Sequence, residues 1–201
     1  VCSSDLAVDA YPHWAGARPG DIIFKDVNGD NVIDGNDRVR NDKSRTPRFT
    51  GGLNVDLGYK DFDLSFLLQG AMGGVFYQTT ESGDFANFLK SFYDNRWTEE
   101  NPDADFPRTY NRSNEYFINQ QNTFWLHKTD YIRLKNIELG YTVPSIWSKK
   151  IGVEHLRVYI NAYNLLTISP DMKDYDPENT SGSGYNYPLN KVINFGVNLT
   201  F

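Results

Sequence analysis

The last eleven residues of the chain alternate with a period of two, and this pattern limits the possible folds more than any other feature. One face carries Ile193, Phe195, Val197, Leu199 and Phe201, and the other carries Val192, Asn194, Gly196, Asn198 and Thr200. Such a period indicates a β-strand with one apolar face. A strand needs about 9–11 residues to cross a bilayer, so this strand is long enough to do so.

Four more segments show the same period. They are residues 48–59, 61–70, 130–142 and 155–164. In the third segment the pattern changes phase, because Ile132 and Leu134 fall on the face opposite to Ile137 and Leu139. One extra residue in a strand reverses the direction of every later side chain. The change predicts either a β-bulge between the two halves of that strand or an upper half that stands above the bilayer.

The connections between these strands alternate in length. Backward from Phe201 they are long (165–190), short (143–154), very long (71–129) and tight (60–61). Outer-membrane barrels have short periplasmic turns and long extracellular loops, so the parity puts Phe201 on the periplasmic side. Aromatic residues fall at the predicted periplasmic ends, where a girdle would lie: Tyr59, Phe62, Tyr141 and Phe201. A soluble β-sandwich alternates in the same way, but its strands are usually only about 5–6 residues long.

Composition and the start of the chain bear on the possible partners and on whether the N-terminus is native. A net charge of −6 without a basic patch argues against nucleic acid as a partner. No signal peptide is present, although an exported protein requires one. The chain is then either soluble and cytoplasmic or a fragment whose own N-terminus is missing, and its first residues favour the fragment. Residues 1–6 resemble a translated sequencing adapter, in which case Cys2 is not native. The expected organisation is an extracellular loop over 7–47 followed by barrel strands and loops over 48–201.

No arrangement of residues in the sequence predicts an enzyme. The histidines His13, His127 and His155 are far apart, and no Gly-x-Ser-x-Gly nucleophile motif is present. Paired acids such as Asp174 and Asp176 are more often solvated or cation-bound than catalytic. Aromatic side chains in the long loops could stack on sugars or anchor a protein interface, or simply pack on one another. They include Trp97, Tyr110, Tyr116, Phe117, Phe124, Trp125, Tyr175, Tyr185 and Tyr187. The sequence does not identify which of them contacts a substrate.

One local motif predicts a structural Ca²⁺ site. Asp26, Asn28, Asp30, Asp34 and Asp37 place oxygen-bearing side chains at positions 1, 3, 5, 9 and 12 of an EF-hand-type loop. Val32, at position 7, would contribute its backbone carbonyl. Two features depart from the pattern: position 6 is Asn31 instead of Gly, and position 12 is Asp instead of Glu. The alternative is an acidic surface turn held by Asx hydrogen bonds.

Several segments together resemble the SusC/RagA family of TonB-linked outer-membrane proteins. They occur in order along nearly the whole chain after residue 16, and no single one is decisive. These segments are Arg18–Ile22, Asp26–Asp30, Leu68–Gly70, Arg96–Pro102, Tyr131–Asn136, Leu139–Pro144, Asn164–Leu166, Asp174–Glu178 and the terminal strand.

The resemblance implies the C-terminal portion of a large antiparallel transmembrane β-barrel of about 22 strands. It implies TonB-dependent import of glycans or peptides across the outer membrane of Bacteroidetes-like bacteria, together with a SusD-like surface lipoprotein. TonB would act through the missing N-terminal region. The family also implies that the barrel-assembly machinery reads Phe201 as an assembly signal. The alternative function is a soluble, calcium-stabilised β-sandwich that binds glycans or mediates adhesion.

Overall fold

The computed structural model describes residues 11–79, 88–110, 119–179, 181, 187 and 189–201. The chain divides into two compact units. The first, called here the loop unit, comprises the described parts of Val1–Lys43 and Phe76–His127. The second, the strand unit, comprises Ser44–Val75, Lys128–Asn179 and the described parts of Tyr187–Phe201.

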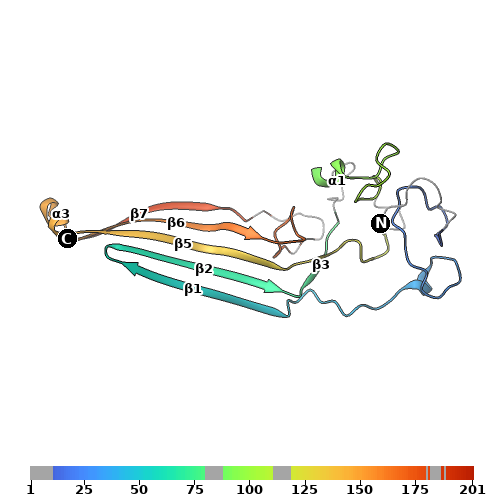
Figure 1. The fold of residues 1–201 in the computed structure, drawn as a ribbon, viewed down its shortest axis with the longest axis horizontal. Helices are drawn as coiled ribbons and strands as arrows, with labels where there is room; N and C mark the ends of the chain where they lie inside the picture. Colours follow the sequence, from blue (N-terminus) through green and yellow to red (C-terminus); the bar gives the residue numbers. More distant parts are fainter. Residues whose placement is uncertain (1–10, 80–87, 111–118, 180, 182–186, 188) are drawn as a thin grey trace. The chain divides into compact units, whose positions relative to one another are not determined.

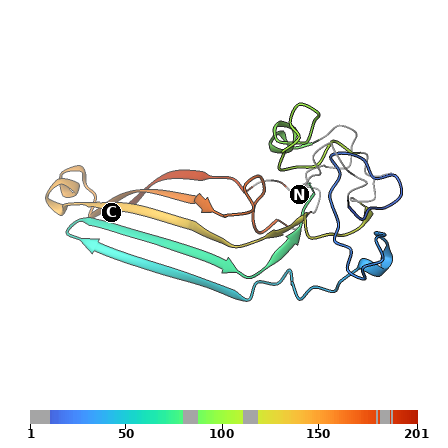
Figure 2. The ribbon, with the colours of Figure 1, turned by 45° about the vertical axis from the view of Figure 1, so that its right-hand side comes forward.

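The strand unit is built on one antiparallel five-stranded sheet in the order β1-β2-β5-β6-β7 (Figures 1 and 2). Its strands are β1 (Phe49–Tyr59), β2 (Phe62–Met72), β5 (Tyr131–Val143), β6 (His155–Ile168) and β7 (Val192–Thr200). Each of the five overlaps one segment predicted from the period-two pattern, although β6 is longer than predicted. The prediction that one sheet contains them, with β1 and β7 as its two edges, is also confirmed.

The register places side chains of one kind in continuous rows across the sheet. One row contains only apolar residues: Val55, Phe66, Ile137, Ala162 and Ile193. The adjacent row, on the opposite face, contains only polar ones: Asp56, Ser65, Glu138, Asn161 and Asn194. Rows alternate between faces because successive residues of a strand point in opposite directions. The sheet therefore has an apolar face and a polar face, as its sequence predicts.

The predicted bulge in β5 is present. The register shifts between Leu134 and Asn136, which leaves Lys135 without a partner and returns Leu134 to the apolar face beside Leu68. The neighbouring strand β6 shifts at the same height, where Asn164 has a positive φ of 52°. After this irregularity β6 continues to Ile168. The predicted end at residue 164 was too early, because the local change of phase resembles a strand end.

Two short connections lie at the same end of the sheet. Lys60 and Asp61 link β1 to β2, with Lys60 at a φ of 55°. The connection from β5 to β6 contains the short helix α3 (Ser145–Ser148) and the 3-10 turn η3 (Lys149–Ile151). At this end the apolar face carries the predicted aromatic residues. Tyr59 pairs with Phe62, and the rings of Phe62 and Tyr141 lie 4.7 Å apart.

The loop unit packs around an aromatic core. The buried residues of this core are Trp14, Ile22, Ile33, Phe92, Tyr110 and Trp125. Its regular elements are the 3-10 turn η2 (Gly35–Asp37) and the helix α1 (Lys90–Asp94). A separate two-stranded sheet consists of β3 (Val75–Tyr77) and β4 (Leu126–Lys128). Within the described parts of the chain, no helix has both the length and the apolar character needed to span a membrane.

Candidate functional site

The polar face of the sheet carries a hydrogen-bonded chain of side chains that crosses four strands. We call it the polar chain, and its members are Asp63 on β2, Glu138 on β5, Arg157 and Asn161 on β6, and Asn194 on β7. The Arg157 guanidinium forms ion pairs with Asp63 and with Glu138, the latter at 2.7 Å. Asn161 donates to Glu138 at 3.3 Å, and Asn194 donates to Asn161 at 2.9 Å. Each group therefore has a partner of complementary charge or polarity on another strand.

Gly140 makes the Arg157–Asp63 contact possible. Arg157 and Asp63 lie on strands that are separated by β5, so their side chains must meet above it. Gly140 is the β5 residue at this point, and a Cβ there would lie 2.5 Å from the Asp63 carboxylate oxygens. The absence of a side chain leaves room for the ion pair.

We expect Gly140→Ala to lower the free energy of unfolding of the full-length protein by about 1–3 kcal/mol, because the added methyl group overpacks a space that is already filled. Samples are heated in steps before electrophoresis, and the temperature at which the band of the folded form disappears measures this effect. Gly58→Ala is the matched control, since Gly58 lies in the same row and a Cβ there would meet nothing within 4 Å. Equal losses in both variants would contradict the role assigned to Gly140.

The apolar face is largely uncovered. Phe195 has 82% of its surface exposed, and Leu57 and Leu139, in the same row, are also exposed. Soluble monomers rarely expose one continuous apolar surface of this extent. Something apolar outside this chain, either lipid or protein, must therefore cover the face.

A second polar group, the Arg133 cluster, lies near the start of β5, at the end of the sheet opposite the two short connections. Arg133 is fully buried, and its guanidinium contacts Thr167 at 3.0 Å, Glu178 at 2.5 Å and Asp176 at 2.6 Å. Tyr131 donates its hydroxyl to Glu178 at 2.9 Å. Burial of a charge is favourable only when the charge is paired and hydrogen-bonded, as it is here. The cluster attaches the segment after β6 to the sheet.

Sequence reasoning missed this cluster. It treated Asp176 as a solvated or cation-binding acid, whereas the structure pairs it with Arg133. Two further bonds support the attachment: the Lys128 amide donates to Asp171 at 2.7 Å, and Ser169 donates to the Asp130 carbonyl at 2.8 Å. The only sign of the cluster in the sequence was Arg133 itself, a charged residue within a segment in which apolar and polar residues otherwise alternate.

A groove of about 480 Å³ lies beside the attached segment. Tyr175 lines it, and burial raises the pKa of the Tyr175 hydroxyl above its usual value. Met172, Pro177 and Leu189 add apolar surface. The groove is open to solvent, so its volume alone does not identify a ligand site.

The other loop aromatics have different surroundings. Tyr110 and Trp125 are buried in the aromatic core, where their rings lie 6.2 Å apart. Phe124 contacts Trp125 edge-on at 4.7 Å, so these residues pack on one another. Trp97 is half-buried beside Gly20, and Tyr187 is exposed. Tyr116, Phe117 and Tyr185 lie outside the described residues.

The predicted calcium loop is held together by its own carboxylates. Each carboxylate oxygen of Asp26, Asp30, Asp34 and Asp37 accepts a hydrogen bond within the loop. Hydrogen bonds from the backbone N–H groups of Asp34 and Val27 lower the pKa of the Asp37 carboxyl. Asn31 adopts the left-handed conformation that Gly usually provides at this position, with a φ of 61°. Asn28 donates its amide to Asp30 at 2.8 Å.

These bonds agree with both interpretations of the loop. They satisfy the carboxylates without a cation, as in an Asx-stabilised turn. The described residues contain no group of three or more His, Cys, Asp or Glu side chains arranged to hold a metal ion. Each oxygen nevertheless keeps a second lone pair, and the oxygen-rich donor set is the type that Ca²⁺ prefers. Calcium binding by Asp26, Asn28, Asp30, Val32, Asp34 and Asp37 therefore stays a prediction.

Titration calorimetry on the full-length protein tests it. We expect one calcium site in the wild type and its loss in Asp26→Ala combined with Asp30→Ala, because these residues supply the first and fifth ligand positions. Asp42→Ala, outside the motif, is the control. Identical heats in the double variant and the wild type would remove the assignment.

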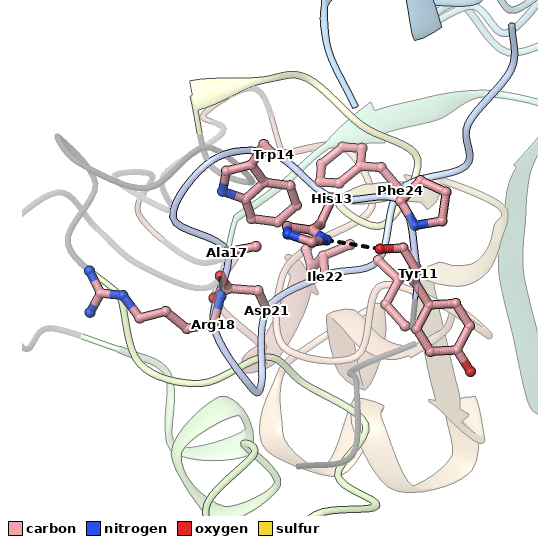
Figure 3. Close-up of a pocket in the computed structure, with 10 residues that line it drawn as sticks. Tyr11, His13, Trp14, Ala17, Arg18, Asp21, Ile22 and Phe24 are labelled. Carbon is pink, nitrogen blue, oxygen red and sulfur yellow. Dashed lines mark hydrogen bonds between the residues drawn. The ribbon is translucent and has the colours of Figure 1, made fainter. Parts of the chain in front are cut away.

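Trp14 and His13 are among the residues that line a small pocket in the loop unit (Figure 3). His13 makes a hydrogen bond with the Tyr11 carbonyl at 2.9 Å, and the rings of Trp14 and Phe24 meet edge-on. The free volume is about 20 Å³, which holds a water molecule but neither a sugar nor a peptide. We interpret this pocket as part of the packing of the loop unit.

Comparison with known proteins identifies the type of molecule to which this sheet belongs. TonB-dependent receptor P3 of Formosa agariphila is 32% identical over 91% of this chain. The TonB-dependent receptor SusC of Bacteroides thetaiotaomicron is 29% identical over 92% of it. The chain belongs with the TonB-dependent receptors of the SusC/RagA type. A structure of the RagAB peptide transporter aligns with 85% of the chain at 28% identity and a TM-score of 0.64. The RagAB peptide importer in its open-open state aligns with a TM-score of 0.60 at 29% identity.

The match covers most of the chain but little of its relatives. The chain spans 19% of receptor P3 and 18% of SusC, and 19% of the matched chain of the RagAB transporter. No family model matches the sequence. The predicted resemblance is confirmed, and these relatives are receptors and transporters, in agreement with the prediction that the chain is not an enzyme. Phe201 follows β7 with its ring exposed, and its role as an assembly signal stays a prediction.

Proposed function

We propose that this chain forms part of the wall of a TonB-dependent importer in the outer membrane of a Bacteroidetes-like bacterium. The observation that supports this most directly is the row pattern of the sheet. Five long strands present unbroken apolar rows on one face and the polar chain on the other. Lipid would cover the apolar face, and the polar face would line the lumen.

The remaining parts of the proposal concern the whole protein. The two edge strands would pair with strands outside this chain to close a barrel of about 22 strands, because an open edge is not stable in lipid. Energy would come from TonB, and the barrel-assembly machinery would insert the protein. A SusD-like lipoprotein would bind at the extracellular side, and the cargo would be glycans or peptides. The similarity to SusC and to the RagAB peptide importer supports these assignments.

Gene deletion in the source organism tests the function. We expect loss of growth on one class of polymer, either oligopeptides or glycans, and recovery when the full-length gene is restored. Growth should fail again when tonB is deleted, whereas growth on the corresponding monomers should continue. An affinity-tagged receptor should co-purify a surface lipoprotein from outer membranes. Unchanged growth on every peptide and glycan source would contradict the proposal.

The alternative is a soluble, calcium-stabilised module for glycan binding or adhesion. Its apolar face would have to be covered by a second sheet, as in a β-sandwich. Among the described residues, the structure contains one five-stranded sheet whose apolar side chains, Phe195 among them, are exposed, and this favours the importer. Membrane fractionation separates the two hypotheses directly.

A further inference from the structure

The connection from β5 to β6 exposes three large apolar side chains at one end of the sheet. Ile146, Trp147 and Ile151 have 73%, 62% and 67% of their surfaces exposed. We call Ser145–Gly152 the apolar turn. A water-facing turn of this length would ordinarily carry polar side chains, so the exposed residues need an explanation.

Backbone hydrogen bonds give the apolar turn a defined conformation in which these side chains point outward. The turn ends in a Schellman motif, in which the Val153 amide bonds the Ser148 carbonyl and the Gly152 amide bonds the Lys149 carbonyl. Gly152 adopts the left-handed conformation that this motif requires, with a φ of 78°. Ser148 and Val153 already fill the inside of the turn. The Glu154 amide also bonds the Thr200 carbonyl, which fixes the turn to β7.

The charge pattern of the turn indicates what could cover it. Lys149 and Lys150 are exposed between Trp147 and Ile151. The turn itself contains no acidic residue. Val143 and Leu156, which flank it, lie opposite each other in an apolar row of the sheet, so the turn continues the apolar face. Tryptophan beside lysine is typical of the membrane interface, where the ring reaches the acyl boundary and the ammonium groups reach phosphate.

We propose that the apolar turn inserts into the adjacent lipid leaflet and anchors the barrel rim to anionic phospholipid. Ile146, Trp147 and Ile151 enter the boundary between headgroups and acyl chains. Lys149 and Lys150 contact headgroup phosphates. This inference rests on the proposed function, because it requires the apolar face to be in a bilayer. A soluble periplasmic protein is the other possible occupant, and the experiment separates the two.

Spin labels on the purified full-length receptor test the insertion. The receptor, with its other cysteines replaced, is reconstituted in vesicles of phosphatidylethanolamine and phosphatidylglycerol. We expect a label at Ile146→Cys or Ile151→Cys to collide with oxygen more than with a water-soluble nickel complex. Phe195→Cys on the apolar face is the lipid reference, and Asn41→Cys in the loop unit is the water reference.

The outcomes distinguish the inference from the proposed function. A lipid signal at residue 195 with a water signal at 146 and 151 overturns the anchor and leaves the importer intact. Water signals at all three positions overturn both. Water signals at 146 and 151 in vesicles, combined with protection in native outer membranes, assign the turn to a protein partner and overturn the lipid anchor.

The two lysines are tested separately. Lys149→Gln with Lys150→Gln should lower the insertion of the turn in vesicles that contain phosphatidylglycerol by about fivefold per lysine, which corresponds to roughly 1 kcal/mol each. In phosphatidylcholine vesicles the same variant should match the wild type. Equal insertion of variant and wild type in both kinds of vesicle overturns the role of the headgroups.

Discussion

Val197→Lys is expected to reduce assembly of the full-length protein in the outer membrane strongly, whereas Asn198→Lys is expected to be tolerated. The two residues are neighbours on β7 but belong to opposite faces. Val197 lies on the apolar face near the middle of β7, opposite Val158, and Asn198 lies opposite Arg157 on the polar face. A lysine near the bilayer midplane costs about 2–4 kcal/mol, while a charge on the lumen side is much milder.

Depth provides a second comparison within the same strand. Ile193 lies on the apolar face near the start of β7. A lysine there can extend to the interface, so we expect Ile193→Lys to cost no more than about 0–1 kcal/mol. Heat-modifiable receptor in isolated outer membranes measures all three variants. Equal insertion of Val197→Lys and Asn198→Lys would show that the face assignment is wrong.

The strands could be predicted from the sequence because their signal is local. Side chains alternate along each strand whatever its neighbours are, so the pattern is readable in a single segment. The bulge at Lys135 was also readable, since it changes the phase of the pattern within one strand. The extension of β6 past Asn164 was not, because it depends on a left-handed residue that only pairing with β5 makes favourable.

The polar chain and the Arg133 cluster could not be predicted, for a related reason. Alternation assigns Asp63, Glu138 and Arg157 to one face but gives no register between strands. Their contact depends on Gly140 lying between Asp63 and Arg157, which requires the pairing of three strands. Asp176 and Glu178 reach Arg133 from a long connection, and its path leaves no periodic signal in the sequence.

The Arg133 cluster gives the second large effect, because its charge is fully buried. Asp176→Asn combined with Glu178→Gln leaves the guanidinium without an anionic partner. Removal of one side of a buried ion pair costs about 3–5 kcal/mol, somewhat less where the carboxylates are partly exposed. The segment from Ser169 to Glu178 should therefore detach. Hydrogen exchange at the Lys128 amide, which donates to Asp171 in this segment, measures the detachment.

Arg133→Met separates this effect from a general loss of packing. It removes the buried charge and retains apolar volume, so it leaves Asp176 and Glu178 to be hydrated by the solvent that already reaches them. Replacement of a whole buried ion pair by apolar side chains is often close to neutral, and here the two carboxylates that remain are already partly exposed to solvent. We expect exchange at the Lys128 amide to rise about a hundredfold or more in the double variant, because each 1.4 kcal/mol is about tenfold, and much less in Arg133→Met. If Arg133→Met raises exchange as much as the double variant does, then the guanidinium attaches the segment by its own bonds and the unpaired buried charge is not the cause.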